Sequence, residues 1–72
     1  MYNSNFRIDY KNKKEASESK YAYAISEVRT VCCDFGCTLS ASNLEMVREM
    51  ERLEMLTIPF LDGTATVNIT RL

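Results

Sequence analysis

Three cysteines are the residues of this 72-residue sequence best suited to metal or redox chemistry: Cys32, Cys33 and Cys37. Structural zinc requires four ligands, usually spaced pairs of cysteine with further cysteine or histidine. The sequence has no second cysteine pair and no histidine, so Asp34 is the nearest candidate for a fourth ligand. The dipole at the C-terminus of a helix also disfavours a thiolate. We therefore expect ordinary thiols, with no metal and no cofactor. A zinc- or thiol-dependent protein is kept as the third hypothesis.

General acid–base chemistry lacks its usual residues. Without histidine, the commonest general base and the usual serine and cysteine triads are absent. The carboxylates lie at spacings that helix caps, turns and helical ion pairs explain. The chain has two glycines, Gly36 and Gly63, and each has a cap or turn role rather than a place in a phosphate-binding loop. The sequence thus predicts a protein that is not an enzyme.

A group of basic residues near the N-terminus suggests contact with nucleic acid. Its members are Arg7, Lys11, Lys13, Lys14 and Lys20, with Tyr10, Tyr21 and Tyr23 nearby. Cations interleaved with aromatic side chains can contact phosphates and stack on bases. However, Glu15 and Glu18 interrupt the run, and the net charge of the chain is −1. A nucleic-acid-binding regulator that uses Arg7 and the Lys11/Lys13/Lys14 cluster is therefore the alternative hypothesis.

The element expected at the centre of the fold is a helix over Ser17–Gly36. Its apolar residues recur with helical period and form one stripe: Tyr21, Ala24, Ile25, Val28, Val31, Cys32 and Phe35. A strand over residues 21–25 is less favoured because the alternation does not continue. The helix is expected to begin at Asn12, with Glu15 completing a capping box, or at Ser17. Gly36 is its expected C-terminal cap.

Two further elements flank this helix. The alternation of Phe6, Ile8 and Tyr10 predicts a short strand, followed by a turn over residues 11–14. A second helix is expected from Ser40 or Ser42 to residue 56 or 57, because the proline at position 59 disfavours helical conformation in the residue before it.

The C-terminal stretch predicts a β-hairpin around Asp62 and Gly63, a strong two-residue turn signal. In the expected register Ile58 lies beside Val67, and Pro59 faces Thr66 at a hydrogen-bonded position. Because proline has no N–H to donate, the first arm is expected to be an edge strand. We therefore predict an α+β fold in the order β-α-α-β-β. Two helices pack on one face of a small, three-stranded, mainly antiparallel sheet.

Length and composition indicate the number of domains, the cellular location and the possible assembly of the protein. Residues 1–72 are expected to form a single compact domain with residues 1–5 frayed. The N-terminus lacks the apolar core of a signal peptide, and no apolar run could span a membrane. An odd number of cysteines suits the reducing cytoplasm, so we expect a cytoplasmic protein. We also expect no contact with a membrane. A core this small leaves a monomer and a homodimer equally open.

Partner binding is the function that remains. Some large side chains fall outside the buried stripes of the two expected helices: Tyr23, Leu44, Arg48, Arg52 and Met55. Methionines suit an adaptable contact surface, and three of the four in this chain lie on the expected second helix. We predict a small non-catalytic module, an inhibitor, adaptor or small regulator, that binds a protein partner through exposed helix faces.

Overall fold

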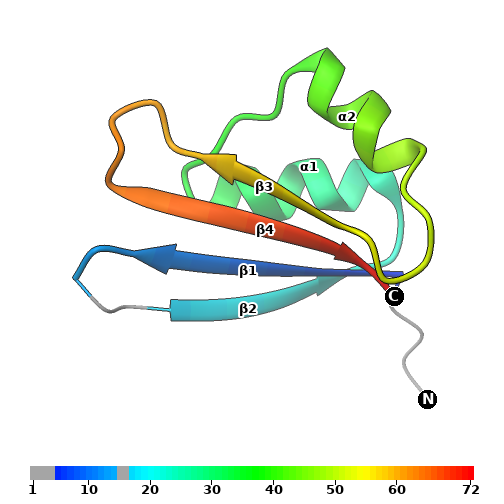
Figure 1. The fold of residues 1–72 in the computed structure, drawn as a ribbon, viewed down its shortest axis with the longest axis horizontal. Helices are drawn as coiled ribbons and strands as arrows, with labels where there is room; N and C mark the ends of the chain where they lie inside the picture. Colours follow the sequence, from blue (N-terminus) through cyan, green and yellow to red (C-terminus); the bar gives the residue numbers. More distant parts are fainter. Residues whose placement is uncertain (1–4, 15–16) are drawn as a thin grey trace.

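Four strands form one antiparallel sheet, and two helices pack on one of its faces (Figure 1). The structure is a computed structural model that describes residues 5–14 and 17–72. The elements in chain order are β1 (Phe6–Asn12), β2 (Ser17–Ala22), α1 (Ile25–Asp34), α2 (Ala41–Arg48), β3 (Met55–Pro59) and β4 (Ala65–Arg71). The strand order is β2-β1-β4-β3, with every neighbouring pair antiparallel. The predicted α+β class is confirmed, but the sheet has four strands rather than three.

The additional strand, β2, occupies the first third of the predicted long helix. It pairs with β1 from Phe6 opposite Ala22 to Lys11 opposite Ser17. β1 is a central strand, and β2 supplies the hydrogen bonds that one of its two sides requires. α1 begins only at Ile25, where the Glu27 carboxylate accepts hydrogen bonds from the Tyr23 and Ala24 N–H groups at 3.2 and 3.3 Å. The predicted helix start at Asn12 or Ser17 is therefore wrong, and its partner Glu15 lies outside the described residues.

The C-terminus of α1 is as predicted. Gly36 has a φ of +96°, a conformation in which other residues are strained. The Cys37 N–H donates to the Cys32 carbonyl at 2.8 Å, and the Gly36 N–H donates to the Cys33 carbonyl at 2.9 Å. These two bonds form a Schellman motif, which satisfies carbonyl groups that the helix itself leaves free.

The second helix is shorter than predicted. Ser40 caps it by accepting a hydrogen bond from the Asn43 N–H at 3.0 Å, so the first of the two expected starts is confirmed. The helix ends at Arg48 rather than near residue 56. Leu56 and the residues after it join β3, where they pair with β4. The connecting turn contains Leu53, which has a φ of +70° and is exposed.

The β3–β4 hairpin has the predicted register, with Ile58 opposite Val67 and Pro59 opposite Thr66. Its hydrogen bonds differ from the prediction, because the Phe60 N–H donates to the Ala65 carbonyl at 2.9 Å. Bonding alternates along an antiparallel pair, so the backbone of Pro59 faces the free edge of the sheet. β3 is an edge strand as predicted, and its proline interrupts no bond to β4.

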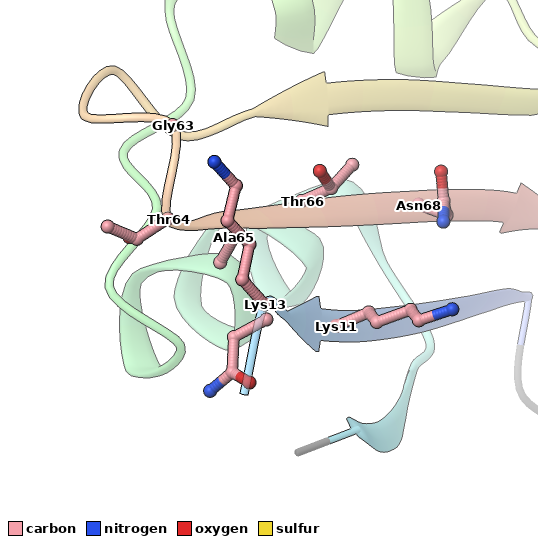
Figure 2. A pocket seen from close by; sticks show the side chains of 8 residues that line it. Lys11, Lys13, Gly63, Thr64, Ala65, Thr66 and Asn68 are labelled. Atoms are coloured by element: carbon pink, nitrogen blue, oxygen red, sulfur yellow. The ribbon is translucent and has the colours of Figure 1, made fainter. Parts of the chain in front are cut away.

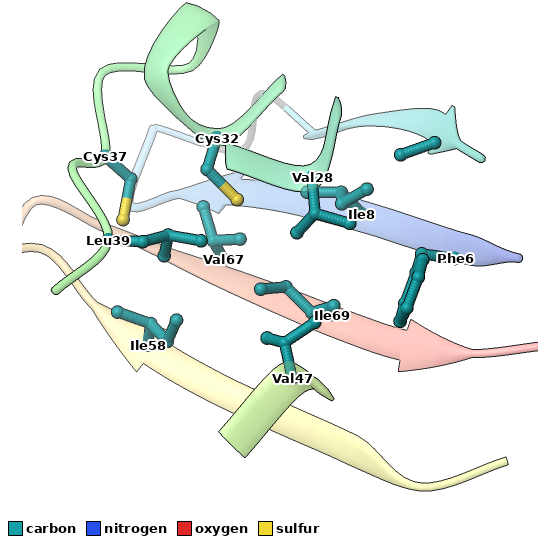
Figure 3. Close-up of a cluster of buried hydrophobic side chains, with 11 residues drawn as sticks. Phe6, Ile8, Val28, Cys32, Cys37, Leu39, Val47, Ile58, Val67 and Ile69 are labelled. Carbon is teal, nitrogen blue, oxygen red and sulfur yellow. The ribbon is translucent and has the colours of Figure 1, made fainter. Parts of the chain in front are cut away.

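The core lies between the sheet and the helices (Figure 3). Val28 and Cys32 of α1 and Val47 of α2 are fully buried against sheet residues such as Ile8 and Ile69. Around them the buried cluster is completed by Phe6, Ala22, Cys37, Leu39, Ile58 and Val67. Of the described helices, neither is long and apolar enough to cross a membrane.

Candidate functional site

The sheet face opposite the helices carries three rows of side chains. The strand registers place Tyr21, Arg7, Thr70 and Met55 in the first row, Ser19, Asp9, Asn68 and Thr57 in the second, and Ser17, Lys11, Thr66 and Pro59 in the third. We call these residues the open face. No helix in the described part of the chain covers it, because both helices pack on the other side. The side chains here are mostly hydroxyl, amide or basic groups.

The first row contains a buried hydroxyl group. Thr70 lies between Arg7 and Met55 and is only 7% exposed. Its Oγ1 has no hydrogen-bond partner among the described residues. A buried polar group without a partner destabilises a protein by about 1–3 kcal/mol. This row also holds Tyr21, the aromatic side chain of the open face, which is half-exposed.

The polar side chains of the second row pair with one another and with Arg7 of the first row. The Arg7 Nε lies 3.1 Å from Asp9 Oδ2, and the Ser19 hydroxyl donates to Asp9 Oδ1 at 2.5 Å. The Thr57 hydroxyl donates to Asn68 Oδ1 at 2.7 Å, which leaves the amide nitrogen of Asn68 as its donor. Asp9 is the one carboxylate of the open face, and its charge is therefore compensated by groups beside it.

A hollow of about 270 Å³ lies at the end of the third row (Figure 2). Lys11 and Lys13 approach it from β1 and the turn that follows, and Thr64, Thr66 and Asn68 approach it from the β4 side. Among the described residues its lining contains two ammonium groups and no carboxylate. Such a lining favours an anion.

The Asp62 carboxylate near this hollow is held by its own turn. It accepts hydrogen bonds from the Thr64 N–H at 3.0 Å and from the Thr64 hydroxyl at 2.7 Å. These bonds lower the pKa of Asp62, because they favour the charged form. Both bonds are accepted by Oδ1, so this oxygen is engaged within the β3–β4 turn.

Charge is segregated in the molecule despite its net value of −1. The segment of residues 7–14 holds four basic residues and one carboxylate. The segment of residues 45–54, in α2 and the turn after it, holds four glutamates and two arginines. The molecule therefore presents a basic region at β1 and an acidic region at α2 and its following turn.

The five residues predicted to bind a protein do not form one surface. Leu44 and Arg48 line a hollow of about 590 Å³ between α1 and α2. Tyr23 lies between β2 and α1, Arg52 lies in the turn before β3, and Met55 lies on the open face. The prediction that all five lie on helix faces is wrong, because α1 begins later and α2 ends earlier than expected.

The predicted basic cluster, in contrast, is largely brought together. Arg7 and Lys11 lie on the open face, Lys13 lines the hollow at its end, and Lys14 follows in the turn. Sequence reasoning missed Asn68 and Thr70 as members of the site. Their alternation along the chain marks one side of a strand, but it does not reveal that this strand lies beside β1.

The three cysteines lie in different environments. Cys32 and Cys37 are buried, whereas Cys33 is exposed. Burial raises the pKa of Cys32 to about 12, with a smaller contribution from nearby Cys37, and burial also raises the pKa of Cys37. Neither thiol is therefore activated as a nucleophile. The described residues contain no group of three or more side chains placed to hold a metal ion.

Comparison with protein-family models, with curated proteins and with solved structures finds no match to this chain.

Proposed function

We propose that the protein is a non-catalytic module that binds single-stranded nucleic acid on the open face. The observation that carries this proposal is the placement of Arg7, Lys11 and Lys13 along one exposed surface. The one carboxylate on that surface, Asp9, is compensated by Arg7 and Ser19. Cations placed in this way neutralise phosphates, and neutral hydroxyl and amide groups supply further hydrogen bonds.

An exposed aromatic ring on the open face favours a single strand over a duplex. Tyr21 is 49% exposed and stands in the same row as Arg7, so a base can stack on its ring. Stacking on aromatic side chains and a basic groove for the backbone are the two means by which single strands are bound. The most acidic part of the chain, α2 and its following turn, is poorly suited to entering a duplex groove.

Binding can be measured by fluorescence anisotropy with a labelled single strand of about ten nucleotides, a length that one small domain can cover. We expect an affinity that falls with salt, with a slope of about −1.4 in the logarithmic plot for Lys11 and Lys13, because Arg7 is paired with Asp9. The double variant Lys11→Gln/Lys13→Gln should weaken binding at least tenfold and reduce that slope.

The matched control is Arg29→Gln/Arg52→Gln, which removes the same charge from exposed positions outside the open face. It should leave the affinity nearly unchanged. If both double variants weaken binding equally, net charge rather than the open face is responsible. Absence of binding by the wild-type protein at low salt would reject the proposal.

A second candidate is the predicted protein-binding function, located in the hollow between α1 and α2. Leu44 and Ile25 supply apolar surface there, and Arg29 and Arg48 supply positive charge, with Asp34 beside them. We propose as occupant a partner segment that presents an apolar side chain next to a carboxylate.

Two arginines test this candidate because only one of them lines the hollow. A partner protein retained by the wild-type chain and by Arg52→Glu, but lost with Arg48→Glu, would support the hollow as a docking site. Equal retention by all three proteins would contradict it. Retention can be followed by affinity capture and mass spectrometry.

A further inference from the structure

The outer edge of β2 presents backbone groups that pair with no strand in the described part of the chain. The Lys13 N–H donates to the Thr64 carbonyl on the β4 side at 3.2 Å, so odd-numbered residues of β1 bond towards β4. Even-numbered residues of β1 therefore bond towards β2, and the register pairs them with even-numbered residues of β2. The Ala22 carbonyl likewise faces β1, because it accepts a hydrogen bond from the Asn5 N–H at 3.0 Å. Ser17, Ser19 and Tyr21 consequently turn their N–H and carbonyl groups to the free edge.

The other edge of the sheet is less suitable for pairing. The residues of β3 that face outward are Met55, Thr57 and Pro59, and proline has no N–H to donate. Prolines at edge strands are one means by which proteins prevent further strand addition. β2 has no such residue along its described length.

We propose that β2 pairs antiparallel with β2 of a second copy of this chain, giving a two-fold symmetric dimer with a continuous eight-stranded sheet. The charge pattern of β2 is complementary to itself in one register. With Ser19 on the two-fold axis, Glu18 of each copy lies opposite Lys20 of the other copy. Both residues point to the helix side of the sheet, so each symmetric pair brings opposite charges together.

Neighbouring registers lack this complementarity. Outward-facing residues must pair with outward-facing residues, so the register can shift only in steps that keep this alternation. One step in one direction places Glu18 opposite Glu18 of the other copy. One step in the other direction places Lys20 opposite Lys20 of the other copy. Like charges directly opposite each other destabilise a strand pair, so the charges select the register centred on Ser19.

The symmetric dimer is also a closed assembly. Pairing through β2 uses that edge in both copies and leaves only the two β3 edges, which contain Pro59. A two-fold axis perpendicular to the sheet keeps the helices of both copies on one side. The open faces of the two copies then adjoin on the other side, with Ser17 of one copy opposite Tyr21 of the other.

Complementary charge variants test this interface through the mass of the protein in solution. Sedimentation equilibrium or light scattering of the wild-type protein should give a dimer. Glu18→Lys opposes two lysines at both symmetric positions, and Lys20→Glu opposes two glutamates. Each variant alone should raise the dimer dissociation constant about tenfold or more, because two attractive pairs become repulsive. An equimolar mixture should restore the dimer, because the two lysines of one variant then lie opposite the two glutamates of the other.

Several outcomes would overturn the proposal. A wild-type protein that is monomeric up to its solubility limit, variants that dimerise as well as wild type, or a mixture with no more dimer than its components would each do so. Far-UV circular dichroism first confirms that each variant is folded, and the double exchange Glu18→Lys/Lys20→Glu should again form a homodimer. Glu49→Lys and Arg52→Glu are charge-matched controls at the end of α2 and in the turn after it, and both should remain dimeric. No nucleic acid enters these measurements, so the dimer stands or fails independently of the proposed function.

Discussion

At the residue scale, the fold uses two of the three cysteines, Cys32 and Cys37, for packing. Cys32 lies on the predicted apolar stripe of α1 and is fully buried beside Val28. Its place on the stripe could be predicted because α1 keeps its helical period from residue 25 onwards. The helical period also predicts Tyr21 on this stripe, but Tyr21 lies on the open face because residue 21 belongs to a strand. Periodicity therefore predicts burial only where the type of element is also right.

The burial of Cys32 predicts a loss of stability in alkaline solution. Its pKa is raised from 9.0 to about 12 in the folded protein, so the unfolded chain loses the thiol proton first as the pH rises. Stability contributed by the buried thiol is fully present below pH 9 and is lost progressively towards pH 12. Urea unfolding at a series of alkaline pH values, with reductant present, measures this slope.

The variants Cys32→Ala and Cys33→Ala separate this effect from the titration of other groups. Cys32→Ala should reduce the alkaline slope, although it also lowers stability at neutral pH by removing a buried group. Cys33→Ala removes an exposed thiol and should keep the wild-type slope. An unchanged slope in Cys32→Ala would show that the buried thiol does not cause the alkaline loss.

At the element scale, the predictions succeeded where a local signal marks the start or the end of a helix. Gly36 and Ser40 mark the end of α1 and the start of α2 through bonds within their own segments. The predictions failed where pairing with a distant strand determines whether a segment is a helix or a strand. Residues 17–22 become a strand because β1 has an unpaired side, and Leu56 leaves the second helix because it pairs with Ile69. Neither cause is visible in the local sequence, so the sheet was predicted with one strand too few.

The candidate site depends on the same distant pairing. The basic cluster could be predicted from the sequence because its members lie within eight consecutive positions of the chain, residues 7–14. The contribution of β4 could not be predicted, because it requires β1 and β4 to be neighbours. The hollow in which Lys11 meets Thr66 and Asn68 arises only from that neighbourhood.

At the scale of the whole molecule, the proposed dimer and the proposed nucleic-acid surface make a joint prediction. The two-fold axis reverses the direction of one open face relative to the other, so the two sites favour strands that run in opposite directions. Two short strands joined by a flexible spacer through like ends, 3′ to 3′ or 5′ to 5′, can occupy both sites at once. The second contact is then intramolecular, and the joined pair should bind the wild-type protein about tenfold or more tightly than one strand.

The variant Lys20→Glu, used below its raised dimer dissociation constant so that it is monomeric, separates this gain from simple duplication of binding sites. It has one open face per molecule, so the joined pair should exceed the single strand by only about twofold, the statistical factor for two identical ligands. Comparing joined with single strands in each protein cancels the effect of the altered charge on overall affinity. The same two strands joined 3′ to 5′ present the wrong direction to one site and should give a smaller gain in the wild-type protein. Fluorescence anisotropy measures all of these affinities. An equal gain in the wild-type protein and in Lys20→Glu would contradict a binding surface shared across the dimer, because such a surface requires both copies of β2.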